Sequence, residues 1–366
     1  MNKEKSRRTF LKQSAAGGLL LSTPSWYVPS SGRTRSQDLK PISDPTLPCH
    51  ILSAYDLDSA FSEQIQSISP EIHLHRRSKD DDDTELLQQA HVYVGRLSQD
   101  DFRLTENLGW IHSTSAGVEK QLFSEVVSSD IIVSNAKGCY APAIADHTIG
   151  MLLALTRQIS TQIRQMPRHT WGGSGDQVEM KDMTMGIVGF GGIGRQVARR
   201  AKALDMHILA ADIQAYYPEQ IGDLCEELYH VDGGGLESLL AQSDVVVCAA
   251  PHTHKSEGMF GKAQFAQMKA GAYFINVSRG KLVDTSALIE SIRSGHLQGV
   301  ALDVTDPEPL PSGHALWDLD NVIVTSHISG RSQYSRKRVQ SVLVDNISRY
   351  IHGYPLLNLV DKEAGF

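Results

Sequence analysis

Short apolar runs alternate with helical patterns along most of the chain. Apolar strands are predicted at Ile51, His91–Val94, Trp110–His112 and Ile131–Val133. This alternation is typical of an open parallel sheet with helices on its faces. We therefore expect the folded part to begin near Cys49 with an α/β domain.

A second series of strands and helices follows a long helical pattern. Apolar positions recur with helical spacing over Ala143–Gln165, Pro167 ends the pattern, and strand and helix signals then alternate to Thr325. A last helix is predicted over Ser332–His352 and should pack back on the first domain. The predicted fold is α/β with two domains, a doubly wound parallel Rossmann sheet over 150–331 inserted in a flavodoxin-like substrate domain formed by 49–149 and 332–366.

Composition and charge agree with a two-domain α/β protein and argue against nucleic acid as a partner. The chain has 366 residues, 41% of them apolar, which is enough for two buried cores. Its formal net charge is −7, and an acidic chain offers no basic face for nucleic acid. No apolar stretch reaches the roughly 20 residues that a membrane-spanning helix needs. We expect neither a nucleic-acid partner nor a membrane span.

The N-terminus resembles a twin-arginine export signal. Arg7 and Arg8 lie among a serine, a phenylalanine, a leucine and a lysine, and the short apolar run Ala15–Leu21 follows. We expect residues 1–36 to hold this signal and the start of a linker, and residues 37–48 to be linker. The protein would then be periplasmic or otherwise exported, or cytoplasmic if the signal is not used. The cut would lie between about Ser22 and Ser36, or the signal would remain as a tether.

Metal sites are not expected. Cys49, Cys139, Cys225 and Cys248 show no CxxC spacing and no companion histidines at zinc spacing, so free buried thiols are predicted, with disulfides in an oxidising compartment as the alternative. The acidic run Lys79–Asp83 lacks the glycine and the spaced ligands of a calcium loop and is predicted to be a solvated helix start. His73 and His75 have no partner cluster in the sequence and are predicted to be surface histidines.

A glycine motif indicates a dinucleotide site. The pattern GFGGIG, residues 189–194, follows the apolar run Met185–Gly189 and precedes a helical pattern over Arg195–Ala203. In this strand–turn–helix context the pyrophosphate would rest on the helix N-terminus. Asp212 ends the next predicted strand, where its carboxylate can accept hydrogen bonds from the adenosine ribose and repel a 2′-phosphate, so NAD is expected over NADP. The predicted contacts are Gly189, Gly191, Gly192, Ile193, Gly194, Arg195 and Asp212, with free N–H groups at Ile193 and Arg195.

A cation follows another predicted strand. Arg279 comes directly after the apolar run Tyr273–Val277 and before Gly280. Its guanidinium would therefore emerge at the carboxyl edge of the sheet, where ligands bind in such folds, and could hold a carboxylate. A structural ion pair is the alternative for this arginine.

The order of these parts resembles the NAD-dependent D-2-hydroxyacid dehydrogenase family, from about Ala90 to the C-terminus. The glycine motif, the segment NVSRG at 276–280 and Thr325-Ser326-His327 carry the resemblance. It implies a catalytic set of Arg279 for the substrate carboxylate, His327 as acid in reduction and base in oxidation, and Glu308 as the hydrogen-bond partner of His327.

The resemblance also implies further contacts. The turn Pro251-His252-Thr253 is similar to a turn that lines the nicotinamide ribose, although His252 and His254 leave a metal as the weaker alternative. Asp303 would contact the nicotinamide carboxamide, and the loop Ser115-Ala116-Gly117 would grip the substrate carboxylate through backbone N–H groups. The additional cofactor contacts are Pro251, Thr253, Val277, Ser278, Asp303 and His327, and the substrate contacts are Ser115, Ala116, Gly117 and Arg279.

Two residues depart from the family pattern. Ser326 stands where proline is usual, and Arg331 follows Gly330 where a small residue is commoner. A cation near His327 would favour a substrate with a second anionic group. Replacing Arg331 with alanine is therefore expected to raise the Michaelis constant for dianionic substrates only.

The expected reaction is hydride transfer between NAD(H) and a small 2-oxoacid or D-2-hydroxyacid such as glyoxylate or hydroxypyruvate. Because no added regulatory domain follows, the long phosphoglycerate dehydrogenases are a poorer match. The alternative is a protein of the same fold that senses NAD(H) with little turnover. The residues before Gly138 give no support to a third interpretation, a formate dehydrogenase. Trp171 and the apolar crossing helix are expected to support a homodimer.

Overall fold

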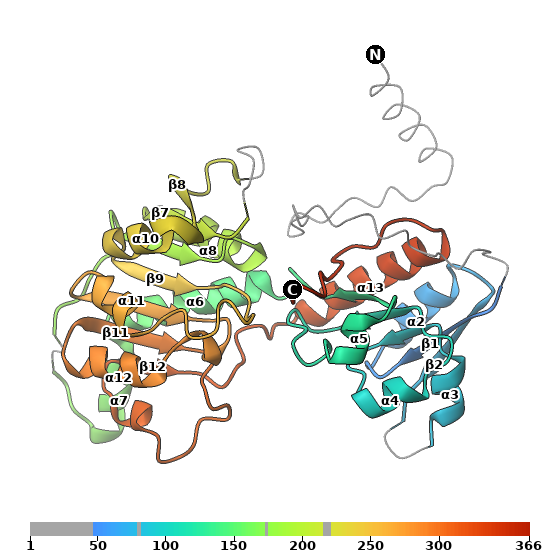
Figure 1. Ribbon diagram of the computed structural model, residues 1–366. Helices are drawn as coiled ribbons and strands as arrows, with labels where there is room; N and C mark the ends of the chain where they lie inside the picture. The colour runs from blue at the N-terminus through green and yellow to red at the C-terminus, as the bar shows by residue number, and fades with distance from the viewer. Residues whose placement is uncertain (1–46, 79–81, 173–174, 215–220) are drawn as a thin grey trace.

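Two α/β domains make up the molecule, a computed structural model that describes residues 47–78, 82–172, 175–214 and 221–366 (Figure 1). The predicted export signal and nearly all of the linker lie outside the described residues, as do residues 79–81 of the acidic run. Within the described ranges, no helix is both long and apolar enough to cross a membrane.

The first domain contains a five-stranded sheet in the order β2-β1-β3-β4-β5, with every neighbouring pair parallel. This is the flavodoxin-like order. Its strands are β1 (Cys49–Ser53), β2 (Ile72–Arg76), β3 (Val92–Val94), β4 (Trp110–Ser113) and β5 (Ile132–Asn135), and its helices are α2 (Ser59–Gln66), α3 (Thr84–Gln89), α4 (Gln99–Leu104) and α5 (Ser124–Ser128).

Helices cover both faces of this sheet. Ile51 and Trp110 pack on one face against Leu343 and Ile347 of the last helix, α13 (Ser335–Ile351). The other face packs Leu52, Tyr93 and Ile111 against the α3 side of the domain. Strands buried on both faces read as continuous apolar runs, which is why the sequence pattern predicted them.

The second domain contains a seven-stranded parallel sheet in the order β12-β11-β10-β9-β6-β7-β8. The order reverses between β9 and β6, so the crevice outside the carboxyl ends at this point is the expected ligand site. Its strands are β6 (Thr184–Val188), β7 (His207–Asp212), β8 (Glu227–His230), β9 (Val245–Cys248), β10 (Ala272–Asn276), β11 (Leu297–Leu302) and β12 (Val322–Val324), and its main helices are α8 (Gly192–Lys202), α10 (Leu236–Gln242), α11 (Lys262–Gln267) and α12 (Thr285–Arg293).

The predicted crossing helix is two helices. α6 (Ala141–Thr156) leaves the first domain and packs on α8, and α7 (Ile159–Gln165) follows it. Gln158 separates them with a left-handed φ of 57°, which an α-helix does not contain. The prediction of one continuous helix over this segment was therefore wrong. Pro167 lies in the short helix η1 (Met166–Arg168), as an end signal should.

The last helix starts later than predicted because serine turns precede it. The Ser332 hydroxyl accepts hydrogen bonds from the N–H groups of Tyr334 and Ser335, at 3.2 and 3.1 Å. Such a side-chain turn competes with helical hydrogen bonding. α13 therefore begins at Ser335, and it ends at Ile351.

The cysteines and the acidic run differ in part from the predictions. All four cysteines are free, but Cys225 is only half-buried. Asp83 is not solvated, since its side chain is buried and lies 3.3 Å from the Nε atom of Arg77. Arg77 also binds Asp101 at 2.8 Å. This ion pair turns the end of the acidic run inward, ahead of α3.

Four histidines gather at the amino end of the first sheet, contrary to the prediction that His73 and His75 lack partners. The register places His50 of β1 opposite His73 of β2. The His50 ring centroid lies 4.8 Å from that of His73, 5.5 Å from that of His75 and 5.8 Å from that of His91. Strand pairing, which the chain order does not display, makes the cluster. In the described part of the chain, no group of three or more His, Cys, Asp or Glu residues is arranged to hold a metal ion.

His112 is the strongest pH-sensitive group of the first domain. Its side chain is fully buried in β4, and Nδ1 lies 2.8 Å from the Ser134 hydroxyl. Burial lowers the pKa of His112 from 6.5 to about 3. Desolvation also lowers the pKa of His50 and that of His91.

We expect the free energy of unfolding to fall as the pH falls below 6.5. The unfolded chain then binds a proton on His112 that the folded chain does not bind until about pH 3, so the loss between pH 6.5 and 5.0 amounts to about 2 kcal/mol. Urea unfolding of wild type and His112→Asn over this range measures it. The variant should lose most of this dependence, and equal pH dependence in the two proteins would contradict the assignment.

Candidate active site

The turn after β6 requires two glycines. Gly189 has a φ of +95°, and a Cβ atom there would lie 2.5 Å from the backbone nitrogen of Ala250. A Cβ atom on Gly194 would lie 2.2 Å from the carbonyl oxygen of Gly189. Both contacts are with backbone atoms, so no side-chain movement would relieve them. These glycines let the strand, the turn and α8 pack closely.

Gly191, by contrast, faces open space. It is the N-cap of α8, and an added Cβ atom would meet nothing within 4 Å. The N–H groups of Gly192 and Ile193 belong to the first helical turn and have no intrahelical acceptor. A helix N-terminus with an open approach fits the diphosphate of a dinucleotide.

The prediction for Arg195 was wrong in one respect. Its N–H group already donates to the Gly191 carbonyl, at 3.1 Å, as the first bond of the helix. Its side chain is buried and its Nε atom donates to the Phe190 carbonyl at 3.0 Å. Arg195 therefore braces the turn, and the free N–H groups lie earlier, at Gly192 and Ile193.

Asp212 lies at the predicted strand end and binds the glycine turn. One carboxylate oxygen accepts a hydrogen bond from the Phe190 N–H group at 2.7 Å, and the other accepts from Gln214 at 3.0 Å. A carboxylate oxygen has a further lone pair beside each of these bonds. The group therefore fixes the turn at the edge of the sheet.

Ser256 closes the turn that was predicted to face the cofactor, and the sequence analysis missed it. Its hydroxyl accepts from the Thr253 N–H group and donates to the Pro251 carbonyl, each at 2.8 Å. Pro251 is exposed, and His252 and Thr253 are half-buried. His252 lies 3.4 Å from the Glu257 carboxylate, which accounts for its position without a metal.

The segment that leads to Arg279 is held between β10 and β9. Val277 donates its N–H to the Cys248 carbonyl at 3.3 Å, and the Ser278 hydroxyl binds the Ala250 carbonyl. This places the predicted residues Val277 and Ser278 beside the Pro251 turn. Arg279 follows at the carboxyl edge, where its Nη1 atom donates to the Ser278 carbonyl at 2.8 Å.

Arg279 reaches the other domain. Its Nε atom donates to Oε1 of Glu119 at 3.0 Å, and a Cβ atom on Gly117 would lie 1.8 Å from its Nη2 atom. The structure thus brings together two predicted substrate contacts that lie more than 160 residues apart in the sequence. Glu119 was missed because no local pattern connects it to Arg279.

The substrate loop before Glu119 is anchored to β5. Ser115 accepts at its carbonyl a hydrogen bond from Ala136 at 3.0 Å, and the Ala116 carbonyl accepts one from the Asn135 side chain at 2.7 Å. Both carbonyl groups are therefore turned toward the first sheet. This anchoring holds the loop beside Arg279.

His327 and Glu308 form a hydrogen-bonded pair. Nδ1 of His327 lies 2.7 Å from Oε1 of Glu308, and both side chains are almost half exposed, at 46% and 44%. An ionised carboxylate only accepts, so Nδ1 carries the proton and Nε2 is left to exchange a proton with a ligand. His327 also has a φ of 54°, a strained conformation for a residue other than glycine.

Asp303 holds the loop that carries His327. Its carboxylate accepts hydrogen bonds from the Thr325 hydroxyl at 2.6 Å and from the N–H groups of Ile328 and Ser329 at 3.0 Å each. Burial works to raise the pKa of Asp303, but these bonds outweigh it and hold the pKa below its ordinary value. The side chain is 0% exposed. Because it is fully buried, it is closed to the implied carboxamide contact in this structure.

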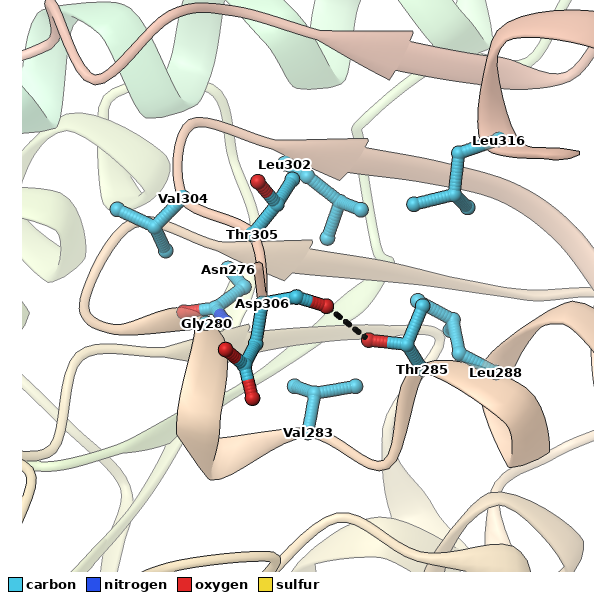
Figure 2. A pocket seen from close by; sticks show the side chains of 10 residues that line it. All are labelled: Asn276, Gly280, Val283, Thr285, Leu288, Leu302, Val304, Thr305, Asp306 and Leu316. Carbon is cyan, nitrogen blue, oxygen red and sulfur yellow. Dashed lines mark hydrogen bonds between the residues drawn. The ribbon is translucent and has the colours of Figure 1, made fainter. Parts of the chain in front are cut away.

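A small pocket lies beside the Arg279 turn (Figure 2). A Cβ atom on Gly280 would lie 2.0 Å from the carbonyl atoms of Thr305, so the turn packs directly on the segment that leads to Glu308. The Thr285 hydroxyl fixes this segment through the Asp306 carbonyl at 3.3 Å. The pocket is largely apolar and belongs to this packing, since the three predicted catalytic side chains do not line it.

Gly189 and Gly191 allow a matched test. Gly189→Ala should lower the free energy of unfolding by about 2 kcal/mol or more, because of the overlap with Ala250 and the positive φ. Gly191→Ala should leave it within about 0.5 kcal/mol of wild type, yet raise the dissociation constant for NADH at least about tenfold by filling the approach to the helix. Urea unfolding and NADH fluorescence measure both, and NADH binding at wild-type strength by Gly191→Ala would contradict the site.

Comparison with known proteins also indicates a dinucleotide-binding domain in the second half of the chain. The family described as D-isomer specific 2-hydroxyacid dehydrogenase, NAD binding domain, matches residues 149–329. D-3-phosphoglycerate dehydrogenase of Archaeoglobus fulgidus is 34% identical over 259 residues, which are 70% of this chain and 48% of that protein. The chain thus spans about half of that relative's length.

A second relative and a solved structure are matched over more of their length. Glyoxylate reductase of Thermofilum pendens is 31% identical over 263 residues, 70% of this chain and 76% of that protein. The crystal structure of a D-isomer specific 2-hydroxyacid dehydrogenase from Xanthobacter autotrophicus, in complex with NADPH and MES, gives a TM-score of 0.74 at 25% identity and covers 87% of this chain and 100% of that one. With the dinucleotide turn and the His327–Glu308 pair in place, the chain belongs to the D-isomer specific 2-hydroxyacid dehydrogenases, a family of NAD-linked oxidoreductases.

Proposed function

We propose that this protein reversibly reduces a small 2-oxoacid to the D-2-hydroxyacid with NADH, and that glyoxylate or hydroxypyruvate is the substrate. The observation that carries the proposal is the His327–Glu308 hydrogen bond of 2.7 Å. It leaves Nε2 of His327 as the proton donor and acceptor, next to the strand ends that carry Arg279. Two relatives named glyoxylate reductase, 31% identical to this chain, agree with this choice of substrate.

Three side chains would act on the substrate. Arg279 would hold the carboxylate through its terminal N–H groups. His327 would donate its Nε2 proton to the carbonyl oxygen in reduction and remove it in oxidation. Glu308 would stabilise the protonated imidazole and fix its orientation, because it holds Nδ1. Bound NAD(H) supplies or accepts the hydride.

We further propose NAD rather than NADP as the cofactor. Asp212 lies at the end of β7, where its negative charge would repel a 2′-phosphate. Its two backbone hydrogen bonds hold the carboxylate in place. The related structure that contains NADPH shows that the fold also accepts the phosphorylated cofactor, so the preference rests on this residue.

We also propose export by the twin-arginine route. The signal around Arg7 and Arg8 lies outside the described residues, and its sequence is the support. This route carries folded proteins, so NAD would travel bound. This proposal implies that the dinucleotide is tightly held, or that a second reaction converts it back to its starting form while it stays outside the cytoplasm.

A homodimer is proposed from an apolar patch after α6. The patch consists of Ile159, Ile163, Met166 and Trp171, all exposed, with Trp171 completely so at 103%. Exposed large apolar side chains are typical of interaction sites when they form a contiguous patch. A second copy of the chain is the proposed partner.

We expect the protein from residue 37 onward to oxidise NADH with glyoxylate or hydroxypyruvate, measured at 340 nm beside pyruvate, phenylpyruvate and oxaloacetate. His327→Gln should lower kcat at least about 100-fold, because the proton donor is lost. His352→Gln, an exposed histidine at the end of α13, is the control. Tight NADH binding without turnover in wild type would instead favour the NAD(H)-sensing alternative.

Export and assembly can be tested on one preparation. When the full chain is expressed in a bacterium with the twin-arginine pathway, the NADH-oxidising activity should be found in the periplasmic fraction. Light scattering on the protein purified from that fraction should give about twice the mass of one chain. Exchanging Arg7 and Arg8 for lysine should keep the activity in the cytoplasm. Ile163→Asp should halve the mass without moving the protein. Wild-type protein found in the cytoplasm would contradict the export proposal. A wild-type protein with the mass of a monomer would contradict the dimer proposal.

A further inference from the structure

Glu119 lies between the predicted substrate loop and Arg279, and it takes no part in the proposed reaction. It follows β4 in the first domain, next to the loop of Ser115 and Gly117, and its side chain crosses to Arg279 of the second domain. Oε1 of Glu119 lies 3.0 Å from Nε of Arg279. The two side chains are 32% and 34% exposed, so each remains partly open to solvent and to a ligand.

Glu119 occupies one edge of the guanidinium. An ideal Cβ atom on Gly117 would lie 1.8 Å from Nη2 of Arg279 and 2.7 Å from Oε2 of Glu119. Oε2 therefore lies on the same side of the pair as Nη2, while the hydrogen bond between the two side chains joins Nε and Oε1. A substrate carboxylate is left with the Nη1 and Nη2 hydrogens not used by Ser278.

The charge of Arg279 is thus already offset. A substrate with one carboxylate gives the local group of Arg279, Glu119 and substrate a net charge of −1, and a substrate with two anionic groups gives it −2. Each additional negative charge is repelled by Glu119 over a few ångströms. The pair is partly solvated, which screens this repulsion and limits it to a modest factor.

We propose that Glu119 is a specificity-determining residue that restricts the site to 2-oxoacids with a single negative charge. The inference rests on the proposed function, in which Arg279 receives the substrate carboxylate. It opposes the expectation for Arg331, whose exposed cation would favour a second anionic group. Both residues can be tested with the same pair of ligands.

Oxamate and oxalate provide the test, because they are close in shape and differ by one charge. Their dissociation constants are measured on the NADH-loaded protein by fluorescence at constant ionic strength, since salt screens the effect. Glu119→Gln keeps an acceptor for the Arg279 Nε atom and removes the charge. We expect the ratio of the oxalate constant to the oxamate constant to fall about fivefold, and kcat/KM for oxaloacetate to rise by about the same factor relative to glyoxylate.

Three variants control the measurement. Glu119→Asp keeps the charge and should leave the ratio within about twofold of wild type. Glu106→Gln, an exposed glutamate before the amino end of β4, should change neither constant. Arg331→Ala should raise the ratio if its cation attracts the second charge.

The outcomes separate the inference from the proposed function. Equal changes in both constants for Glu119→Gln would show that Glu119 only positions Arg279, and the inference would be overturned. Wild-type protein that binds neither ligand would overturn the proposed function itself. A selective gain for oxalate would establish Glu119 as the residue that excludes the second charge.

Discussion

The buried carboxylate of Asp303 is the interaction on which the reaction site depends. It has no exposed surface, and three donors from the segment 325–329 bind it. Burying an ion without partners would cost several kcal/mol, so the segment can adopt its course only while these bonds are made. They hold His327 in its strained conformation at the end of β12. The His147 side chain on α6, 3.0 Å from the Thr325 hydroxyl, ties the same point to the helix between the domains.

Parallel pairing supplies the rest of the arrangement. β10, β11 and β12 are neighbours with the same direction, so the residues that follow them meet at one edge of the sheet. Arg279 follows the first, Glu308 lies in the loop after the second, and His327 follows the third. Gly280 allows the first of these turns to rest on the backbone of the second. Side chains from distant parts of the sequence are therefore brought to one edge by the sheet itself.

The sequence was sufficient to predict those features that depend on neighbouring residues in the chain. Apolar runs located most of the strands, and the glycine motif located a turn whose backbone contacts exclude side chains at Gly189 and Gly194. The pairing of Glu308 with His327 came from resemblance to a family, since nineteen residues separate the two. Arg195 was misread by a single position, because the first helical bond begins one residue earlier than the motif suggests. No glycine or proline marks the helix break at Gln158, so periodicity carried the prediction through it. Glu119, His147 and the histidine cluster depend on contacts between strands or domains, which no spacing along the chain reveals.

Gly117 has a consequence for where the Arg279 cation can lie. The guanidinium lies where a side chain on this residue would begin, 1.8 Å from the Cβ position. The two domains therefore meet here with a backbone on one side and a planar cation on the other. A larger residue at 117 would push aside the guanidinium, which is the far end of a flexible side chain. A hydrogen atom in place of a side chain thus lets the first domain determine the position of a cation that the second domain carries.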